Sequence, residues 1–256
     1  MVATGFSHDP FTPDVPGRET FTGHQVHSAD YRNAGPYRGK NVLVVGTGNS
    51  GAEIAVDLVE GGAAKVAISV RTPPNILRRD LGGIPLQVLA VLIRRLPVRV
   101  VDRIALNLQR LTVGDLSRYG MPNPTLGLYT RVNQDAIPIL DVGLIGLLKK
   151  RRVGVFPAVE RLDGPDVVLD GGRRLRPDAV IWATGFQRGL ERLVGHLGLV
   201  AASGRPAVHG AATHPAAPGL HFIGFSNPIS GNLRETAIDA KRIARAVRRR
   251  RQPAAS

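Results

Sequence analysis

Continuous apolar runs organise the first half of the chain. Residues 40–46 (Lys-Asn-Val-Leu-Val-Val-Gly) form one such run, which is typical of a strand buried on both faces of a parallel sheet. A glycine-rich turn follows, then a stretch that predicts a helix over 50–60, ended by two glycines. A second apolar run predicts a strand over 65–70. Strand, helix and strand together form a βαβ unit, the smallest dinucleotide-binding element.

After residue 70 the regular alternation stops. The pattern predicts helices over 85–96 and 98–111, divided by Pro97, then a loop over 114–124. Residues 1–6 resemble the end of a buried strand, and 7–20 form a proline-punctuated loop. The later expected elements are strands at 153–159, 167–169, 179–183 and 220–225 and a helix over 233–248.

Composition narrows the class of protein. The chain has 256 residues, 43% of them hydrophobic, with 30 Gly and 19 Pro, as in a folded, loop-rich globular protein. It contains no cysteine, which excludes disulfides, thiolate metal sites and cysteine nucleophiles, and we expect no metal site. The start of the chain carries no secretory signal. The longest apolar stretch, 81–93, is shorter than the ~20 residues that a membrane span requires, so we expect a cytoplasmic protein without a transmembrane segment.

The net charge of +14 makes nucleic acid a candidate partner. However, most basic residues are scattered in pairs, and only 149–152 and 248–251 form runs. A solvated face and a helix end explain such runs more simply. We therefore do not expect a nucleic-acid partner.

One motif carries clear chemistry. Gly46-Thr47-Gly48-Asn49-Ser50-Gly51 is a GxGxxG between a predicted strand and a predicted helix. In this context the first glycine permits a tight turn, the second lets the backbone approach a pyrophosphate, and the third lets helix and strand pack closely. The helix start supplies free N–H groups for the phosphates. We therefore predict a dinucleotide site at these six residues.

The residue after the second predicted strand indicates the nucleotide. Arg71 stands where a site that prefers NAD would carry an acidic residue, and an arginine suits the 2′-phosphate of NADP(H). Thr72 adds a hydroxyl donor for the same phosphate. The alternative is that Arg71 is simply a solvated arginine in an arginine-rich chain.

A resemblance to a known family adds to this picture. Taken alone, residues 21–31 predict a loop with an aromatic anchor and two structural histidines. Their FxGxxxHxxxY spacing, however, resembles the identifying motif of flavin-containing monooxygenases. The Ala-Thr-Gly segments at 3–5 and 183–185 resemble the strands that link the FAD and NADPH domains of that family. Residues 96–102, 114–115, 119–122 and 138–143 resemble its YUCCA-type branch and bacterial relatives, and 219–225 with 233–244 resemble its closing strand and helix beside the FAD.

The resemblance implies a class B flavoprotein monooxygenase. In that family NADPH reduces FAD, the reduced flavin captures oxygen as a C4a-hydroperoxide, and a small organic substrate is oxygenated. The resemblance places Thr184 and Gly185 in the cofactor cleft, and Gly224 and Asn232 beside the flavin. Turn or capping chemistry explains each of these four residues equally well. The sequence identifies no catalytic residue.

One departure limits the analogy. The family begins with a separate GxGxxG for FAD, and no such motif precedes residue 3. We therefore expect an α/β fold in which a Rossmann-like NADP(H)-binding domain is joined to a partial FAD-type Rossmann domain without its N-terminal βαβ. The expected parts are the end of the FAD domain and a connector at 1–37, the NADP(H)-binding domain with a helical insertion at 38–187, a C-terminal piece of the FAD domain at 188–247, and a disordered basic tail at 248–256.

The departure leaves three explanations open. The chain is a gene remnant, has a mis-assigned start, or is a half whose partner is encoded separately. The expected partners are a small-molecule substrate and O2, with a missing N-terminal half or a second copy of this chain. The alternative function is a non-catalytic NADP(H)-binding module that cannot retain FAD.

Overall fold

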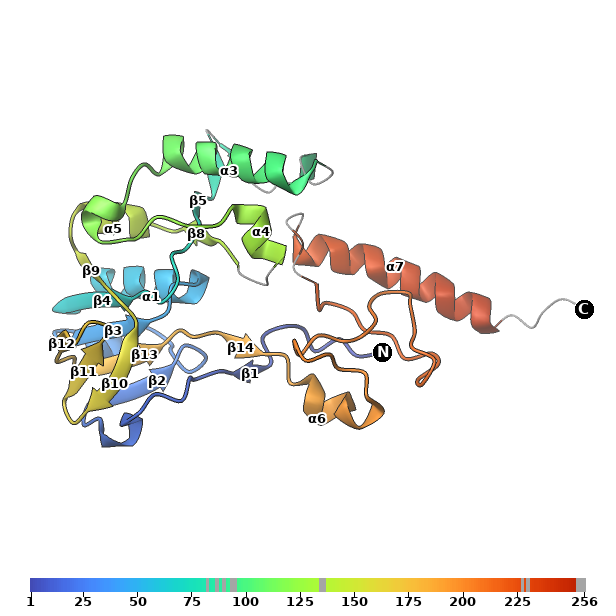
Figure 1. The fold of residues 1–256 in the computed structure, drawn as a ribbon, viewed down its shortest axis with the longest axis horizontal. Helices are drawn as coiled ribbons and strands as arrows, with labels where there is room; N and C mark the ends of the chain where they lie inside the picture. Colours follow the sequence, from blue (N-terminus) through green and yellow to red (C-terminus); the bar gives the residue numbers. More distant parts are fainter. Residues whose placement is uncertain are drawn as a thin grey trace, which may run out of the picture. The chain divides into compact units, whose positions relative to one another are not determined.

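The computed structural model describes residues 1–81, 83–85, 88, 91, 92, 96–133, 137–226, 228 and 231–251. The chain divides into two compact units (Figure 1). The larger unit, called here the sheet unit, comprises Pro10–Leu86 and Arg95–Gly185. The smaller one, called here the terminal unit, comprises Met1–Asp9, Gln87–Arg94 and Phe186–Ser256.

A parallel five-stranded sheet forms the centre of the sheet unit, which confirms the α/β fold class. Its strand order is β2-β13-β3-β4-β9, and every neighbouring pair is parallel. The apolar runs predicted at 40–46, 65–70 and 179–183 form its three middle strands. The strands are β2 (His24–His27), β13 (Ala179–Trp182), β3 (Asn41–Val45), β4 (Lys65–Ser69) and β9 (Val153–Phe156).

Both faces of this sheet are covered. Alternate residues of a strand point to opposite faces, and β3 accordingly contributes Val42 and Val44 to one core and Leu43 and Val45 to another. The first core holds α1 (Asn49–Glu60) and α5 (Leu144–Lys149). The second lies under an antiparallel sheet of β10, β11 and β12 (Figure 1). These strands span Val159–Asp163, Asp166–Leu169 and Arg174–Leu175.

The segment between β4 and β9 is mostly irregular and helical. Here β5 pairs in parallel with β8, β6 pairs with β7, and α3 packs on α4. The helix predicted over 98–111 is confirmed as α3. The helix predicted over 85–96 falls largely outside the described residues. The elements are β5 (Ile76–Arg78), β6 (Asp80–Leu81), β7 (Ile84–Pro85), α3 (Val98–Thr112), η3 (Ser117–Tyr119), α4 (Leu128–Asn133) and β8 (Ile139–Asp141).

Two predictions about strands in the sheet unit are wrong. The expected loop over 21–31 contains β2, an edge strand whose polar residues gave no apolar pattern and whose pairing with β13 holds it in the sheet. The strand expected over 153–159 is two strands, β9 and β10. Pro157 lies between them, and proline has no N–H with which to continue a ladder.

The terminal unit has little regular sheet. The strands expected at 1–6 and 220–225 are reduced to one parallel bridge between Val2 and Phe222. Its small core combines Leu190 and Val194 of α6 (Leu190–Val194) with Phe222 and Phe225. A long helix, α7 (Asn232–Arg251), closes the described chain, so 248–251 are helical and 252–256 lie outside the described residues. The remaining short elements of the two units together are β1 (Asp9–Pro10), η1 (Arg18–Thr20), η2 (Gly35–Tyr37), β14 (Phe186–Gln187) and η4 (Gly195–Leu197); of these, η1 and η2 belong to the sheet unit.

The described helices differ from membrane-spanning helices in length or in apolar character. None of them combines the length and the apolar character that crossing a bilayer demands.

Candidate functional site

The GxGxxG motif forms the turn between β3 and α1, and its three glycines meet different surroundings. Gly46 has a φ of +112°, and a Cβ there would lie 2.4 Å from the Ala183 carbonyl oxygen. A Cβ on Gly51 would lie 2.3 Å from the Gly46 carbonyl oxygen. A Cβ on Gly48 would meet nothing within 4 Å. The first and third glycines thus allow close packing, while the second leaves one side of the turn open to a ligand.

The start of α1 favours an anion. Gly48 is the N-cap in an extended conformation, and no side chain caps the helix. The first turn carries no acidic residue. The first N–H groups of a helix have no intrahelical acceptor, and the helix dipole places partial positive charge there. This helix start therefore matches the phosphate-binding geometry that the sequence predicted.

A pocket of about 570 Å³ opens at this turn. Its size is that of a small-molecule or cofactor site. Seven of the predicted site residues line it together, although they come from three strand ends: Gly46, Thr47, Gly48, Arg71, Thr72, Thr184 and Gly185. The other lining residues are Phe11, Pro13, Asp14, Val15, Pro16, Val45, Ser69, Arg131, Ile137, Ala158, Val159, Glu160, Trp182 and Ala183.

The three other residues of the motif lie in the first turn of α1 and do not line this pocket. Asn49 uses its side chain to hold the segment that enters β8. Its Nδ2 donates to the Pro138 carbonyl at 3.2 Å, and its Oδ1 accepts the Leu140 N–H at 2.8 Å. Ser50 is exposed, and Gly51 is buried. The Asn49 side chain thus holds the segment that enters β8, and the pocket lining does not include it.

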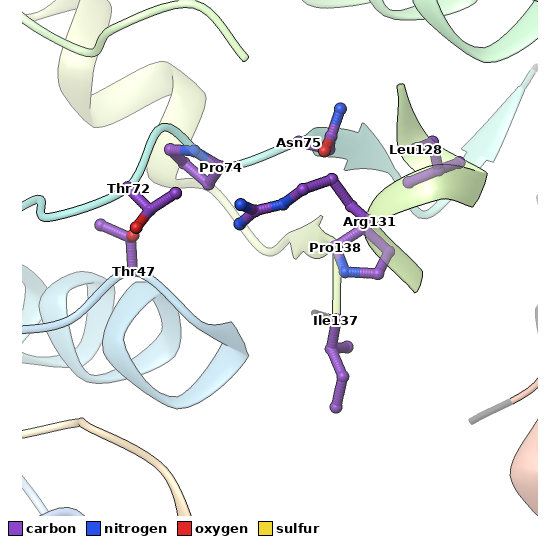
Figure 2. A pocket seen from close by; sticks show the side chains of 8 residues that line it. All are labelled: Thr47, Thr72, Pro74, Asn75, Leu128, Arg131, Ile137 and Pro138. Carbon is purple, nitrogen blue, oxygen red and sulfur yellow. The ribbon is translucent and has the colours of Figure 1, made fainter. Parts of the chain in front are cut away.

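Sequence reasoning missed a second arginine in the pocket. Arg131 of α4 lines both the large pocket and an adjoining cavity of about 40 Å³, together with Thr47 and Thr72. Figure 2 shows its side chain reaching from α4 toward those two threonines. Its Nε is buried and has no hydrogen-bond partner among the described residues. No local pattern marks residue 131, because its position depends on how the segment before β8 folds back.

The charges at the pocket are mixed but favour an anion near Arg71. Within the described part of the chain, neither Arg71 nor Arg131 forms an ion pair with a carboxylate. Two carboxylates, Asp14 and Glu160, also line the pocket, and Glu160 is paired with Arg161 at 3.2 Å. The two arginines thus place positive charge beside the threonines.

The Thr184–Gly185 turn is held by neighbours rather than free. The Thr184 hydroxyl donates to the Phe11 carbonyl. The Nδ1 of His27 accepts the Ala29 N–H at 3.0 Å, so a neutral ring carries its proton on Nε2 and donates it to the Gly185 carbonyl at 3.1 Å. This confirms that His27 is a structural histidine. The turn that lines the pocket is therefore fixed from β2.

The rest of the FxGxxxHxxxY motif is structural too. A Cβ on Gly23 would lie 2.6 Å from the ring of Phe21, which is buried. The Tyr31 hydroxyl donates to Oδ2 of Asp57 on α1 at 2.5 Å. Burial, and then this hydrogen bond, raise the pKa of Tyr31 above its ordinary value. None of the four motif residues lines the described pocket, so the motif joins β2 to β13 and to α1.

The two residues predicted beside the flavin lie in the terminal unit. Gly224 has a φ of +82°, and a Cβ there would meet nothing within 4 Å. Asn232 begins α7, and its Oδ1 accepts the Thr236 hydroxyl at 3.2 Å. These contacts are those of a turn and a helix start, and a flavin role for either residue stays a prediction.

A buried parallel sheet with a glycine-rich turn that opens a helix defines a Rossmann-type α/β protein, and two arginines lie at one pocket beside that turn. Comparison with known proteins is more specific. The flavin-binding monooxygenase-like family model matches residues 1–193. The chain belongs to this family.

Individual relatives agree with the family match. The chain is 39% identical over 189 residues to indole-3-pyruvate monooxygenase YUCCA8 of Oryza sativa subsp. indica, covering 73% of this chain and 45% of that protein. It is 32% identical over 250 residues to indole-3-pyruvate monooxygenase YUCCA1 of Oryza sativa subsp. japonica, covering 96% of this chain and 61% of that protein. The chain thus spans about half the length of these relatives.

Solved structures share the fold. The flavin-containing monooxygenase from Stenotrophomonas maltophilia aligns with a TM-score of 0.59 at 22% identity, over 96% of this chain and 61% of that one. Cyclohexanone monooxygenase from Rhodococcus sp. Phi1, bound to NADP+, aligns with a TM-score of 0.62 at 18% identity, over 96% of this chain and 60% of that one. At these identities the likeness supports the fold alone.

Proposed function

We propose that the pocket beside Gly48 binds NADP(H) and that the chain is the NADP(H)-binding part of an FAD-linked monooxygenase. The observation that carries this proposal is the open side of the Gly46–Gly48 turn at the uncapped start of α1. Backbone N–H groups there would hold the pyrophosphate. Thr184 and Gly185, at the carboxyl end of β13, would line the remainder of the cofactor cleft.

Arg71 and Arg131 would hold the 2′-phosphate that distinguishes NADP(H) from NAD(H). Both line the large pocket, and so do Thr47 and Thr72, which offer hydroxyl donors. A guanidinium offers several N–H donors in a fixed plane, which suits a phosphate. The buried Nε of Arg131, which has no partner in the described chain, would gain an acceptor when the phosphate binds.

The proposed reaction is NADPH-dependent oxygenation of a small organic substrate by O2. Bound NADPH and FAD would supply the hydride and oxygen chemistry, and the family match, together with the YUCCA relatives, supports this class of reaction. The residues of this chain would bind and orient the nicotinamide nucleotide and shield it from water. Gly224 and Asn232 are proposed as flavin neighbours. A separate polypeptide that carries an FAD-binding half, or a second copy of this chain, is proposed as a partner.

The alternative is a non-catalytic NADP(H)-binding module that cannot retain FAD. It is favoured because the described residues contain one GxGxxG turn, at Gly46–Gly51, and the proposal assigns that turn to NADP(H). The two candidates make different predictions for the purified chain. Bound flavin, recognised by its yellow absorption bands, would exclude the module. NADPH binding with no uptake of added FAD would support it.

Titration calorimetry with NADPH and NADH tests the nucleotide site. The chain should bind NADPH more tightly than NADH. The variant Arg71→Asp should weaken NADPH by roughly a hundredfold and NADH only slightly, because one charge-assisted contact is replaced by repulsion of the 2′-phosphate. Trp182 is the only tryptophan and lies at the pocket, so its fluorescence gives a second readout. No heat with either nucleotide, or equal losses for both in Arg71→Asp, would contradict the proposal.

A further inference from the structure

Asp102 lies in α3, within the 96–102 stretch to which the site has so far given no role. Its side chain reaches the start of a different helix, α4. Oδ1 accepts the N–H groups of Tyr129 at 2.5 Å and Thr130 at 3.3 Å, and Oδ2 accepts the Thr130 hydroxyl at 2.6 Å. Free N–H groups at a helix start, and the dipole there, favour a carboxylate. Asp102 is therefore a cap for α4 supplied from outside that helix.

The fit between Asp102 and α4 is close. A Cβ on Gly127 would lie 2.1 Å from Cγ of Asp102 and 2.4 Å from its Oδ2, so the carboxylate packs against backbone that carries no side chain. The Gly127 carbonyl in turn accepts the Arg131 N–H at 3.0 Å. The Asp102 carboxylate thus packs against Gly127, and the carbonyl of Gly127 holds the backbone N–H of Arg131.

The segment before α4 is also tied to the nucleotide side of the pocket. Nδ2 of Asn75 donates to the Leu126 carbonyl at 3.3 Å. Asn75 is buried, and it lines the small cavity together with Thr72 and Arg131. One face of α4 therefore meets the pocket wall, while its first turn is held by α3.

The helix needs such support. It has six residues, and so short a helix is marginal without tertiary contacts. Arg131 lies in its last turn and has an Nε without a partner in the described chain. If α4 frayed, the arginine would have to be ordered at the moment of binding, and the conformational cost would reduce affinity.

We propose that Asp102 is a positioning residue for nucleotide selectivity. By capping α4 it holds Arg131 ready for the 2′-phosphate of NADP(H), which Asp102 itself does not touch. The inference rests on the proposed function, because it requires that the pocket bind NADP(H). It extends that function by assigning selectivity to a contact between two helices of the segment that separates β4 from β9.

The test is a double-mutant cycle on the full chain, with Asp102→Ala, Arg131→Ala and the double variant, titrated with NADPH and NADH. Asp102→Ala should weaken NADPH by about tenfold, the scale of a lost helix cap, and NADH by less than about twofold. In the Arg131→Ala background it should change NADPH binding little, because the two residues act through one contact. Equal losses for NADPH and NADH, or additive effects, would overturn the proposal.

Matched controls separate this role from folding. Asp115 also caps a helical turn of the same segment, since its Oδ1 accepts the Ser117 N–H at 2.9 Å, and Asp115→Ala should leave the NADPH-to-NADH affinity ratio unchanged. If Asp102→Ala does not fold, Thr130→Val removes the hydroxyl bond to Oδ2 and should lower the same ratio by a smaller factor. An unchanged ratio in a folded Thr130→Val protein would then count against the proposal.

Failure of the inference is distinguishable from failure of the function. A wild-type chain that binds neither nucleotide, or binds both equally, would refute the NADP(H) site. A wild-type chain that prefers NADPH, and loses this preference in Arg131→Ala but keeps it in Asp102→Ala, would refute only the role of Asp102.

Discussion

The two units differ most clearly in how their main helices are buried. Helix α1 has 12 residues, of which seven are buried, and it packs on the parallel sheet. Helix α7 has 20 residues, and of 232–250, whose side chains are described, Ile243 is the buried one. Apolar burial supplies most of the free energy that holds a helix in a protein. The pocket beside Gly48 lies in the unit whose main helix is the more deeply buried of the two.

The two units are therefore expected to contribute differently to stability and to binding. In the sheet unit, each face of the sheet has its own apolar cluster, and the pocket opens at the carboxyl ends of the same strands. The terminal unit contributes one small cluster. We expect the sheet unit to carry both stability and nucleotide binding, and the terminal unit to unfold more easily.

The largest loss of stability is expected from a substitution at the centre of the sheet unit. Gly46→Val would force a branched side chain to adopt a φ of +112° and place its Cβ 2.4 Å from the Ala183 carbonyl oxygen. The free energy of unfolding should fall by about 3 kcal/mol, and NADPH binding should be lost. Urea unfolding and calorimetry measure the two effects. Gly146→Ala in α5, where a Cβ meets nothing within 4 Å, is the control and should be neutral or stabilising by up to about 1 kcal/mol.

Two matched side-chain truncations compare how firmly α1 and α7 are packed. Ile54 of α1 and Ile243 of α7 are 6% and 5% exposed. Ile54→Ala should cost about 3 kcal/mol because it leaves a cavity in a closed core. Ile243→Ala should cost less, about 2 kcal/mol, since Ile243 belongs to none of the described apolar clusters. Denaturant unfolding gives both values. Equal costs would mean that α7 is as firmly packed as α1.

The smallest effect concerns the bond between the 21–31 motif and α1. Tyr31→Phe removes the hydrogen bond to Asp57 and should cost about 1 kcal/mol near neutral pH. Because the folded state raises the pKa of Tyr31, the unfolded chain loses its phenolic proton first, and wild-type stability should fall as pH rises above about 10.

In the Phe variant the decline above that pH should be shallower, with a remainder from Tyr37, whose pKa burial also raises. Unfolding midpoints measured from pH 8 to pH 11 test this. Parallel pH profiles for wild type and Tyr31→Phe would contradict the assignment.

The sequence predicted the local parts of the fold. The strands at 40–46 and 65–70, and the helix between them, were readable because their apolar patterns and the GxGxxG turn are contiguous. Strand β2 was missed because its stability comes from pairing with β13, more than 150 positions away in the sequence. The strands expected at 1–6 and 220–225 shrank to a bridge, because an apolar run becomes a strand only where neighbours pair with it.

A glycine-rich turn at the start of α1 and an arginine after β4 can be predicted from the sequence alone, because both are properties of consecutive residues. Only the tertiary structure decided that Arg131 faces the same pocket, that His27 holds the Gly185 carbonyl, and that Asp102 caps α4. Each of these three features brings together segments that lie apart in the sequence. The energy of such a contact depends on its burial and on its hydrogen-bond geometry, and the order of residues along the chain contains neither.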